Sequence, residues 1–404
     1  MKVKIEPSIA NGKVIAPPSK SYAHRYLIAS SLSKGTSKVC GIIHSDDMKA
    51  TLECISALGV SIKQENQTVT LKNERAKNQI ADFYCNESGS TLRFFIPIAL
   101  AYGGVNVFHG TERLISRGIS VYDEICKDQS ITLEKSSDKF TFKGKLKPST
   151  FNVRGDISSQ FITGLLFALP LLEGDSTLNI TTPLESKGYI DITLDVLNQY
   201  GIIIERKENT FFIKGNQKYQ NINAVVEGDM SNAAFLDAFN VLGGEVSVLG
   251  LNHNSKQADA VYSSMLNGLK QSYQVYDISN CIDLGPILFA IAGVSHGAKF
   301  TGTNRLRIKE SDRVIAMVSE LEKFGITADI DEDSVTIHKN KIEKPTKKLY
   351  GHNDHRIVMA LSVISTIYGG EIEGCQAVNK SYPNFFEDIK TLGIKFEVSN
   401  ENNQ

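Results

Sequence analysis

The sequence predicts a mixed α/β protein of the α+β kind, built from two similar lobes that each contain three βαβαββ units. A polar turn followed by an apolar helix recurs six times along the chain, at a spacing of roughly 55–70 residues, which exceeds the period of solenoid repeats. Between these turns, amphipathic helices end at glycine and lead into alternating strands. With 404 residues, the chain is also too long for one ordinary core.

Each polar turn is expected to begin a helix. The turns begin at residues 18–21, 86–89, 155–159, 228–231, 282–285 and 352–356, and the apolar helices behind them include 27–32, 92–100, 161–171, 233–241, 287–294 and 357–367. Helices related by pseudo-threefold symmetry point their N-termini in the same direction. Each lobe is therefore expected to gather three helix N-termini, which favour anions.

Glycine is expected to end the second kind of helix in each repeat, because it supplies the left-handed residue that stops a helix. The expected helix ends and the alternating segments after them are Gly59 with 68–71, Gly201 with 211–213, Gly325 with 334–337, and Gly393 with 394–396. Alternation after the glycine indicates half-buried hairpin strands. The N-terminal residues also read as a strand.

The two lobes are expected to share the chain unequally. One lobe is predicted to span residues 18–226, and the other residues 1–17 together with 227–404. The chain would cross between the lobes at 17–18 and again at 225–228. Two crossings side by side would form a hinge.

The composition is typical of a globular protein and argues against several functional classes. Hydrophobic residues make up 41% of the chain and charged residues 22%. Lys and Arg together number 44 against 45 Asp and Glu, so no basic excess favours nucleic acid. No apolar run approaches the roughly 20 residues of a membrane span, and no secretion signal is expected. The six scattered cysteines lack a CxxC pair, which predicts reduced, mostly buried thiols in a cytoplasmic protein without a zinc site.

Basic residues are concentrated at the polar turns and beside them. They are Lys20, Arg25, Arg93, Arg113, Arg117, Lys187, Arg305, Arg307, Lys309, Arg313, Arg356 and Lys380. Arg forks and Lys ammonium groups suit phosphate and carboxylate. A chain near neutrality with cations gathered there is expected to bind small, multiply anionic ligands. Solvated surface cations beside ordinary helix caps are the alternative.

The acidic residues at two of the turns leave alternatives open. Lys309 and Arg313 are four residues apart and are expected to share a helix face, with Glu310 ionised between cations or buried as a proton shuttle. Asp283 lies in an otherwise apolar turn, where it is either a helix N-cap or a general base. Asp354 with His355 lacks a third ligand in helical reach, so no metal is expected.

In this order, the motifs resemble the 5-enolpyruvylshikimate-3-phosphate synthase family over essentially the whole chain. The matching segments are 18–25, 87–93, 158–160, 186–187, 189–191, 228–229, 283, 307–313, 353–356, and 380 with 382–383. The resemblance implies two lobes of three βαβαββ units joined by a double-crossover hinge. It implies transfer of the carboxyvinyl group of phosphoenolpyruvate to the 5-hydroxyl of shikimate 3-phosphate by a monomeric cytoplasmic enzyme that uses no cofactor.

The resemblance also implies roles for individual residues. Shikimate 3-phosphate would be held by Lys20, Ser21, Arg25, Ser158, Ser159, Gln160, Ser186, Asp283 and Lys309, and phosphoenolpyruvate by Lys20, Gly89, Arg117, Gln160, Arg313, Arg356 and Lys380. Asp283 would take the proton of the attacking hydroxyl. Glu310 and Lys20 would protonate and then deprotonate the methylene carbon. The sequence departs from the family pattern at Glu87, Ser90, Phe94, Gly118 and Arg305, which leaves sensitivity to glyphosate open.

Two other functions compete with this interpretation. UDP-N-acetylglucosamine 1-carboxyvinyltransferase shares the fold and the donor. It differs in its first turn, which has Lys-Asn, and it usually carries a cysteine in the loop after the arginine that matches Arg117. This chain has Lys20-Ser21, and Cys126 lies on a predicted helix. A non-catalytic anion-binding paralogue is the other candidate. The presence of Lys20, Asp283, Lys309 and Glu310 argues against it.

Overall fold

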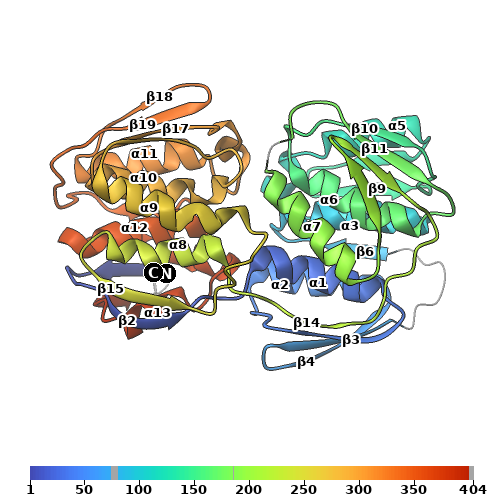
Figure 1. Cartoon of the computed structure of the whole chain (residues 1–404), viewed down its shortest axis with the longest axis horizontal. Coiled ribbons are helices and arrows are strands. Elements are labelled where there is room, and N and C mark those ends of the chain that lie inside the picture. The colour runs from blue at the N-terminus through green and yellow to red at the C-terminus, as the bar shows by residue number, and fades with distance from the viewer. Residues whose placement is uncertain (74–80, 185, 400–404) are drawn as a thin grey trace. The chain divides into compact units, whose positions relative to one another are not determined.

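The computed structural model describes residues 1–73, 81–184 and 186–399. The chain divides into two compact units (Figure 1), which we call the inserted lobe (Pro18–Glu227) and the terminal lobe (Met1–Pro17 with Gly228–Gln404). The second crossing therefore falls one residue later than the sequence predicted. Beside the crossings, the backbone N–H of Ser19 donates to the carbonyl of Glu227 at 2.7 Å within the inserted lobe, and that of Asp229 to Pro17 at 2.7 Å within the terminal lobe.

The inserted lobe alternates helices with short strands. Its elements are α1 (Lys20–Leu32), β3 (Gly35–Cys40), α2 (Asp46–Ala57), β4 (Val60–Glu65), β5 (Thr68–Asn73), β6 (Ala81–Tyr84), α3 (Gly89–Tyr102), β7 (Val105–His109), α4 (Glu112–Ser116), α5 (Ser120–Asp128), β8 (Thr132–Lys135), β9 (Lys139–Lys143), β10 (Thr150–Val153), α6 (Ser159–Ala168), η1 (Leu169–Leu171), β11 (Ser176–Ile180), α7 (Lys187–Gln199), β12 (Ile204–Lys207), β13 (Thr210–Ile213) and β14 (Asn223–Val225).

Three four-stranded sheets of the inserted lobe repeat one strand order. The orders are β14-β3-β5-β4, β6-β7-β9-β8 and β10-β11-β13-β12. In each sheet the first two strands are parallel, and the last two form an antiparallel hairpin. Strand β14, from the end of the lobe, pairs with β3 near its start. This pairing completes the first repeat with a strand that lies far away in sequence.

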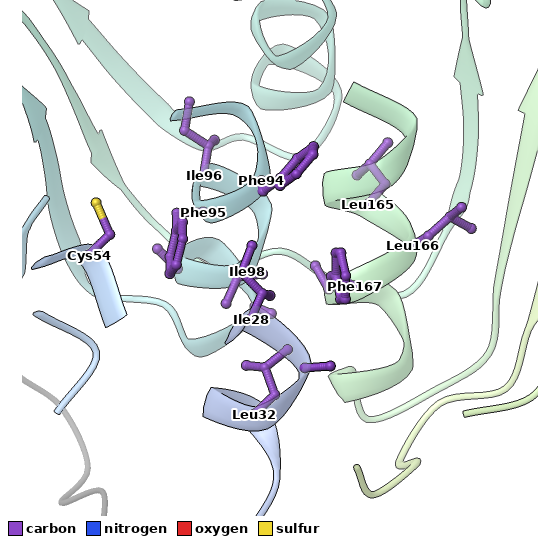
Figure 2. Packing of buried hydrophobic residues seen from close by; sticks show 14 of the residues in the cluster. Ile28, Leu32, Cys54, Phe94, Phe95, Ile96, Ile98, Leu165, Leu166 and Phe167 are labelled. Atoms are coloured by element: carbon purple, nitrogen blue, oxygen red, sulfur yellow. The ribbon is translucent and has the colours of Figure 1, made fainter. Parts of the chain in front are cut away.

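The core of the inserted lobe lies between helices that are apolar around most of their circumference. Figure 2 shows Phe94 of α3 on the side of Leu165 and Phe167 of α6, and Phe95 on the other side of α3, toward Cys54. The rings of Phe94 and Phe167 lie 6.3 Å apart, and all five side chains are at most 1% exposed. A helix that is hydrophobic on all sides belongs in a core. This packing holds the N-termini of α3 and α6 in fixed positions.

The terminal lobe contains the first two strands of the chain and every element after residue 227. Its elements are β1 (Lys2–Ile5), β2 (Asn11–Ile15), α8 (Met230–Asp237), η2 (Ala238–Asn240), β15 (Glu245–Leu249), η3 (Ala258–Val261), α9 (Tyr262–Gln271), β16 (Gln274–Asp277), η4 (Ile282–Leu284), α10 (Gly285–Val294), β17 (Ala298–Thr301), η5 (Asn304–Ile308), α11 (Arg313–Leu321), η6 (Glu322–Phe324), β18 (Ala328–Ile330), β19 (Ser334–Ile337), β20 (Leu349–Tyr350), α12 (His355–Tyr368), β21 (Gly370–Glu373), η7 (Cys375–Lys380), α13 (Phe385–Thr391) and β22 (Phe396–Ser399).

Two sheets of the terminal lobe, β16-β17-β19-β18 and β20-β21-β1-β22, have the same order as those of the inserted lobe. The third contains only β2 and β15 among the described residues. Helix α9 ends at Gln271 and β16 begins at Gln274, so the chain is too short there for the hairpin expected in this repeat. The side chain of Asn240 covers part of the open edge of β15, because it accepts from the Val246 N–H at 2.7 Å and donates to the Val246 carbonyl at 2.9 Å.

Five of the six predicted polar turns begin helices through side-chain caps. The cap residues are Ser19 of α1, Ser88 of α3, Ser158 of α6, Asp229 of α8 and Asp354 of α12. Each accepts a hydrogen bond from an N–H of the first turn, which satisfies a donor that has no partner within the helix. Sequence reasoning missed the hairpin of β8 and β9, because the residue after α5 with positive φ is Ser130 (55°) and not glycine.

Within the described residues, no helix is both long enough and apolar enough to span a bilayer.

All six cysteines are free, and five of them are buried, with Cys40 partly exposed. Burial raises the thiol pKa of Cys126 to about 11 and that of Cys375 to about 12. Because the thiolate is the reactive form, we expect a thiol reagent to modify at most Cys40 quickly in the native protein, and all six thiols in denaturant. Spectrophotometric titration with and without denaturant measures this, and rapid modification of two or more native thiols would contradict it.

Candidate active site

Lys20 lies in the first turn of α1, behind the Ser19 cap. Its ammonium forms an ion pair with Asp47 in the first turn of α2. The side chains of Lys20 and Asp47 are 20% and 12% exposed, so the pair is partly shielded from water. The sequence analysis missed Asp47 as a partner, because it lies on a different helix, 27 positions along the chain. The pair holds the Lys20 ammonium beside the N-termini of two helices.

Arg25 lies one turn further along α1 and is 3% exposed. Its guanidinium donates to the Ser21 carbonyl at 2.8 Å, to the Thr193 hydroxyl at 2.8 Å and to the Tyr189 carbonyl at 3.0 Å. Burial lowers its pKa to about 10, which leaves it charged at neutral pH. These bonds join the start of α1 to the start of α7, where Ser186 precedes the first turn with a φ of 52°.

Two guanidinium groups of the inserted lobe converge on Gly89, the first residue of α3. A β-carbon at Gly89 would lie 2.8 Å from Arg93 Nη1 and 3.1 Å from Arg117 Nη1. Only glycine leaves this space open. The position combines a helix N-terminus with two cations, which is a favourable arrangement for an anion.

Helix α6 begins next to the same position. Ser158 accepts from the Gln160 N–H as the helix cap at 3.3 Å. The Gln160 side chain accepts from Arg93 Nη1 at 2.7 Å and donates to Ser90 Oγ at 3.0 Å. The structure thus brings Gly89, Arg117 and Gln160 together with Arg93, which the resemblance did not assign to a ligand.

In the terminal lobe, Asp283 is the centre of a cationic cluster. Arg313 Nη1 donates to its Oδ1 at 2.8 Å, and Arg356 Nη2 donates to its Oδ2 at 3.0 Å. Lys309 Nζ lies 3.5 Å from Oδ1. Arg356 Nη2 also donates to Ser231 Oγ at 3.0 Å, so residues at the starts of α8, α10 and α12 meet here. The Asp283 side chain remains 17% exposed.

Arg313 is buried between three carboxylates. Besides Asp283, it donates to Glu310 Oε2 and to Asp354 Oδ2, each at 2.8 Å. Burial alone would lower the pKa of Arg313, but the negative charges of Asp354, Glu310 and Asp283 raise it above its ordinary value. Burial alone would raise the pKa of Asp354, but the Arg313 charge keeps it below its ordinary value. The network is therefore charged at neutral pH.

The structure excludes one of the two alternatives for Asp283 and contradicts one expectation about this cluster. Asp283 is not a helix N-cap, because α10 starts after Leu284, which makes no side-chain cap bond. Lys309 and Arg313 do not share a helix face, because Asp312 caps α11 and Lys309 lies outside the helix. The two cations meet at Asp283 through the fold of the 304–313 segment instead.

Sequence reasoning also missed Asp259, which is 5% exposed in η3. Burial, reinforced by the negative charge of Asp283, raises its pKa to about 8, although Arg356 acts in the opposite direction. In the sequence, Asp259 stands between two alanines, and nothing in that pattern indicates that its side chain is buried near Asp283 and Arg356. Lys380 lies in η7 and donates to the Asn353 carbonyl at 2.7 Å, which connects it to the turn that carries Asp354. The described residues contain no cluster of three or more His, Cys, Asp and Glu arranged to hold a metal ion.

The sequence and the fold are both similar to those of known proteins. The family model described as EPSP synthase (3-phosphoshikimate 1-carboxyvinyltransferase) matches residues 6–389. The chain is 42% identical to the 3-phosphoshikimate 1-carboxyvinyltransferase of Clostridium kluyveri over 414 residues, which covers 97% of each chain. It is also 42% identical to that of Clostridium perfringens strain ATCC 13124, over 97% of this chain and 98% of the relative.

Among solved structures, the EPSP synthase of Acinetobacter baumannii has the same two-lobed fold, with a TM-score of 0.79 and 23% sequence identity over 99% of this chain and 100% of that chain. At this identity the likeness concerns the fold. The family model spans nearly the whole sequence, and the relatives align along almost their full length. The chain therefore belongs to the EPSP synthase (3-phosphoshikimate 1-carboxyvinyltransferase) family.

Proposed function

We propose that this member of the family transfers the carboxyvinyl group of phosphoenolpyruvate to the 5-hydroxyl of shikimate 3-phosphate with the residues described above, and releases phosphate. The observation that carries the proposal is Asp283, a partly exposed carboxylate held between Lys309, Arg313 and Arg356. A base among cations suits a reaction that deprotonates a hydroxyl next to two anionic substrates.

Asp283 takes the proton of the attacking 5-hydroxyl. Its two oxygens accept from Arg313 and Arg356, which fixes the plane of the carboxylate. The hydroxyl oxygen then bonds to C2 of phosphoenolpyruvate, while the methylene carbon gains a proton and becomes a methyl group. The product of this step is a tetrahedral ketal.

Elimination reverses the proton transfer at carbon. The methyl group loses a proton, the C2–phosphate bond breaks, and the enol ether forms. Glu310 and Lys20 are the groups that deliver and remove this proton. Glu310 accepts from Arg313 at 2.8 Å, and Lys20 forms an ion pair with Asp47, so each side chain is held in place by a partner of opposite charge.

The remaining roles are those that the resemblance to the family implies. Ser21 and Arg25 hold the carboxylate of shikimate 3-phosphate. Its phosphate is held by Ser158, Ser159, Ser186 and Lys309, with Gln160 over the ring. Phosphoenolpyruvate is held by Lys20, the backbone of Gly89, Arg117, Gln160, Arg313, Arg356 and Lys380. The convergence of Arg93 and Arg117 at the open Gly89 position supports the phosphoenolpyruvate assignment.

Shikimate 3-phosphate, and not a UDP-sugar, is expected to protect the protein against heat. A ligand at about 100 times its Kd stabilises the native state by about 2.7 kcal/mol, which raises Tm measurably. A melting scan with each ligand tests this, followed by a phosphate-release assay with both substrates. A shift with UDP-N-acetylglucosamine alone would favour the sister activity, which the comparisons do not favour.

Lys309 predicts a pH dependence of binding. Burial lowers its pKa to about 8; Asp283 and Glu310 act to raise it, and Arg313 and Arg305 to lower it. The Lys309 side chain is therefore a charged ammonium below about pH 8 and loses its proton, and with it the charge, above that pH. We expect the Kd of shikimate 3-phosphate to rise about tenfold between pH 7 and pH 9.5, measured by calorimetry.

Lys309→Met is the matched variant for this titration, because methionine keeps the length of the chain without the charge. Its affinity should be weak at pH 7 and nearly independent of pH up to 9.5. If the variant retained the pH dependence of the wild type, the titration would belong to another group.

We also propose that the enzyme acts in the cytoplasm as a monomer, with the inserted and terminal lobes as its functional domains. Five buried free thiols support a reducing compartment. Light scattering of the purified protein tests the monomer.

A further inference from the structure

Helix α11 contacts the turn over residues 351–356 near both of its ends. At its start, Arg313 Nε donates to Asp354 Oδ2 at 2.8 Å. Seven residues on, Glu320 accepts from the Tyr350 N–H and from His352 Nε2, each at 2.9 Å. Positions seven apart lie on the same face of a helix, two turns from each other. Helix α11 thus holds the chain both before and after Asn353, through Tyr350 and His352 on one side and Asp354 on the other.

Those residues are His352 and Asn353, which have φ values of 49° and 52°. Histidine and asparagine enter the left-handed region more readily than most side chains, but two such residues in a row still depend on their surroundings to hold them there. The next residue, Asp354, donates its N–H to the Gly351 carbonyl at 2.8 Å and caps α12 through the Arg356 N–H at 3.0 Å. The backbone conformation of His352 and Asn353 therefore sets the position of Asp354 and the direction in which the Arg356 side chain extends from the start of α12.

Glu320 is suited to hold this turn. It is 1% exposed, and Lys323 Nζ donates to both of its oxygens, at 2.8 Å and 2.7 Å. A carboxylate can only accept, so His352 donates through Nε2. Burial alone would raise the pKa of Glu320, but the bonds from His352, Lys323 and the Tyr350 N–H leave it below its ordinary value. The acid is ionised and fully engaged.

We propose that Glu320 and His352 are positioning residues, which hold the 351–356 turn so that Asp354 and Arg356 meet Arg313 and Asp283 in the geometry described above. Neither side chain is assigned a substrate contact; both act through the backbone of the turn. The proposal rests on the proposed role of Arg356 in binding phosphoenolpyruvate. The competing interpretation is that Glu320 only anchors β20 through the Tyr350 N–H.

The test compares Glu320→Gln, His352→Asn and the double variant with wild type. Asparagine tolerates the left-handed region but is too short to replace the histidine ring, and His352 has a side chain that is 33% exposed, so His352→Asn should fold. Glu322→Gln is the matched control, because Glu322 is exposed and lies two residues further along. All variants are assayed well below their Tm, after circular dichroism shows that they are folded.

We expect kcat/KM for phosphoenolpyruvate to fall about tenfold in Glu320→Gln and in His352→Asn, as for a reacting group that is held slightly out of place. The double variant should lose no more than the worse single variant, because the two side chains act as one unit. Glu322→Gln should match wild type. A folded His352→Asn with wild-type kcat/KM would overturn the proposal, and so would additive losses.

Arg356→Lys, assayed in parallel, separates this proposal from the proposed function. If that variant bound phosphoenolpyruvate normally, the role of Arg356 would be wrong, and hydrogen exchange would decide the positioning role. Glu320→Gln and His352→Asn should then speed exchange of the Asp354 and Arg356 amides relative to Glu322→Gln. Unchanged exchange at both amides would overturn the proposal, because the turn would hold its shape without the pair.

Discussion

Replacing Asp283 by alanine is expected to lower kcat by roughly a hundredfold or more, the scale of a lost general base, while the protein still folds. The attacking hydroxyl would have to lose its proton to water, and Arg313 and Arg356 would lose the carboxylate that orders them. Arg313 keeps Asp354 and Glu310 as partners, so the network stays neutralised in part. Steady-state release of phosphate with saturating substrates measures the change.

Asp283→Asn is the sharper companion, because the amide keeps the size of the side chain and loses its basicity. It should be as slow as the alanine variant. Glu332→Ala, an exposed acid of the same lobe, should retain wild-type kcat. If either Asp283 variant turned over normally, Asp283 would have no part in the mechanism.

Replacing Arg313 by methionine is expected to destabilise the terminal lobe by about 3–5 kcal/mol, the cost of breaking a buried ion pair by removing one partner. Arg313 is 1% exposed, and Asp354 is 0% exposed. Without the guanidinium, the buried Asp354 carboxylate would keep the hydrogen bonds from Ser311 Oγ and the Arg356 N–H, but it would lose its arginine partner. Urea unfolding followed by circular dichroism measures the loss.

An exposed arginine with a similar pair provides the control. Arg154 donates to both oxygens of Asp156, at 3.0 Å and 2.7 Å, but its side chain is 57% exposed. Arg154→Met should therefore cost at most about 1 kcal/mol. Equal losses in the two variants would show that burial of Arg313 does not matter.

Lowering the pH should also weaken the ion pair between Arg313 and Asp354, which would show as a loss of stability of the folded protein. The folded pKa of Asp354 lies below its ordinary value because of Arg313, and a depressed carboxyl pKa stabilises the folded state at pH values above the unfolded pKa of about 3.9. This stabilisation disappears as the pH falls through the folded value. Wild type should therefore lose stability below about pH 4, and Arg313→Met should lack that part of the acid dependence.

The sequence alone determined the local structure of most repeats. Ser or Asp before an apolar run predicted the helix starts at Ser19, Ser88, Ser158 and Asp229, and glycine predicted the helix ends. These signals act within one turn of backbone, where a cap or a left-handed residue satisfies its neighbours whatever the rest of the chain does. The exception at Ser130 shows the limit, because a residue other than glycine gave no signal.

Only the tertiary structure decided what the charged residues do. Asp283 turned out to be a carboxylate between cations and not a cap, since Arg313 and Arg356 reach it from 30 and 73 positions away in the chain. The pairing of Lys20 with Asp47 and of Glu320 with His352 was equally invisible. An ion pair depends on the distance and the burial of two side chains, and the packing of separate helices sets both. Local patterns therefore located the turns, and the fold decided which charges meet there.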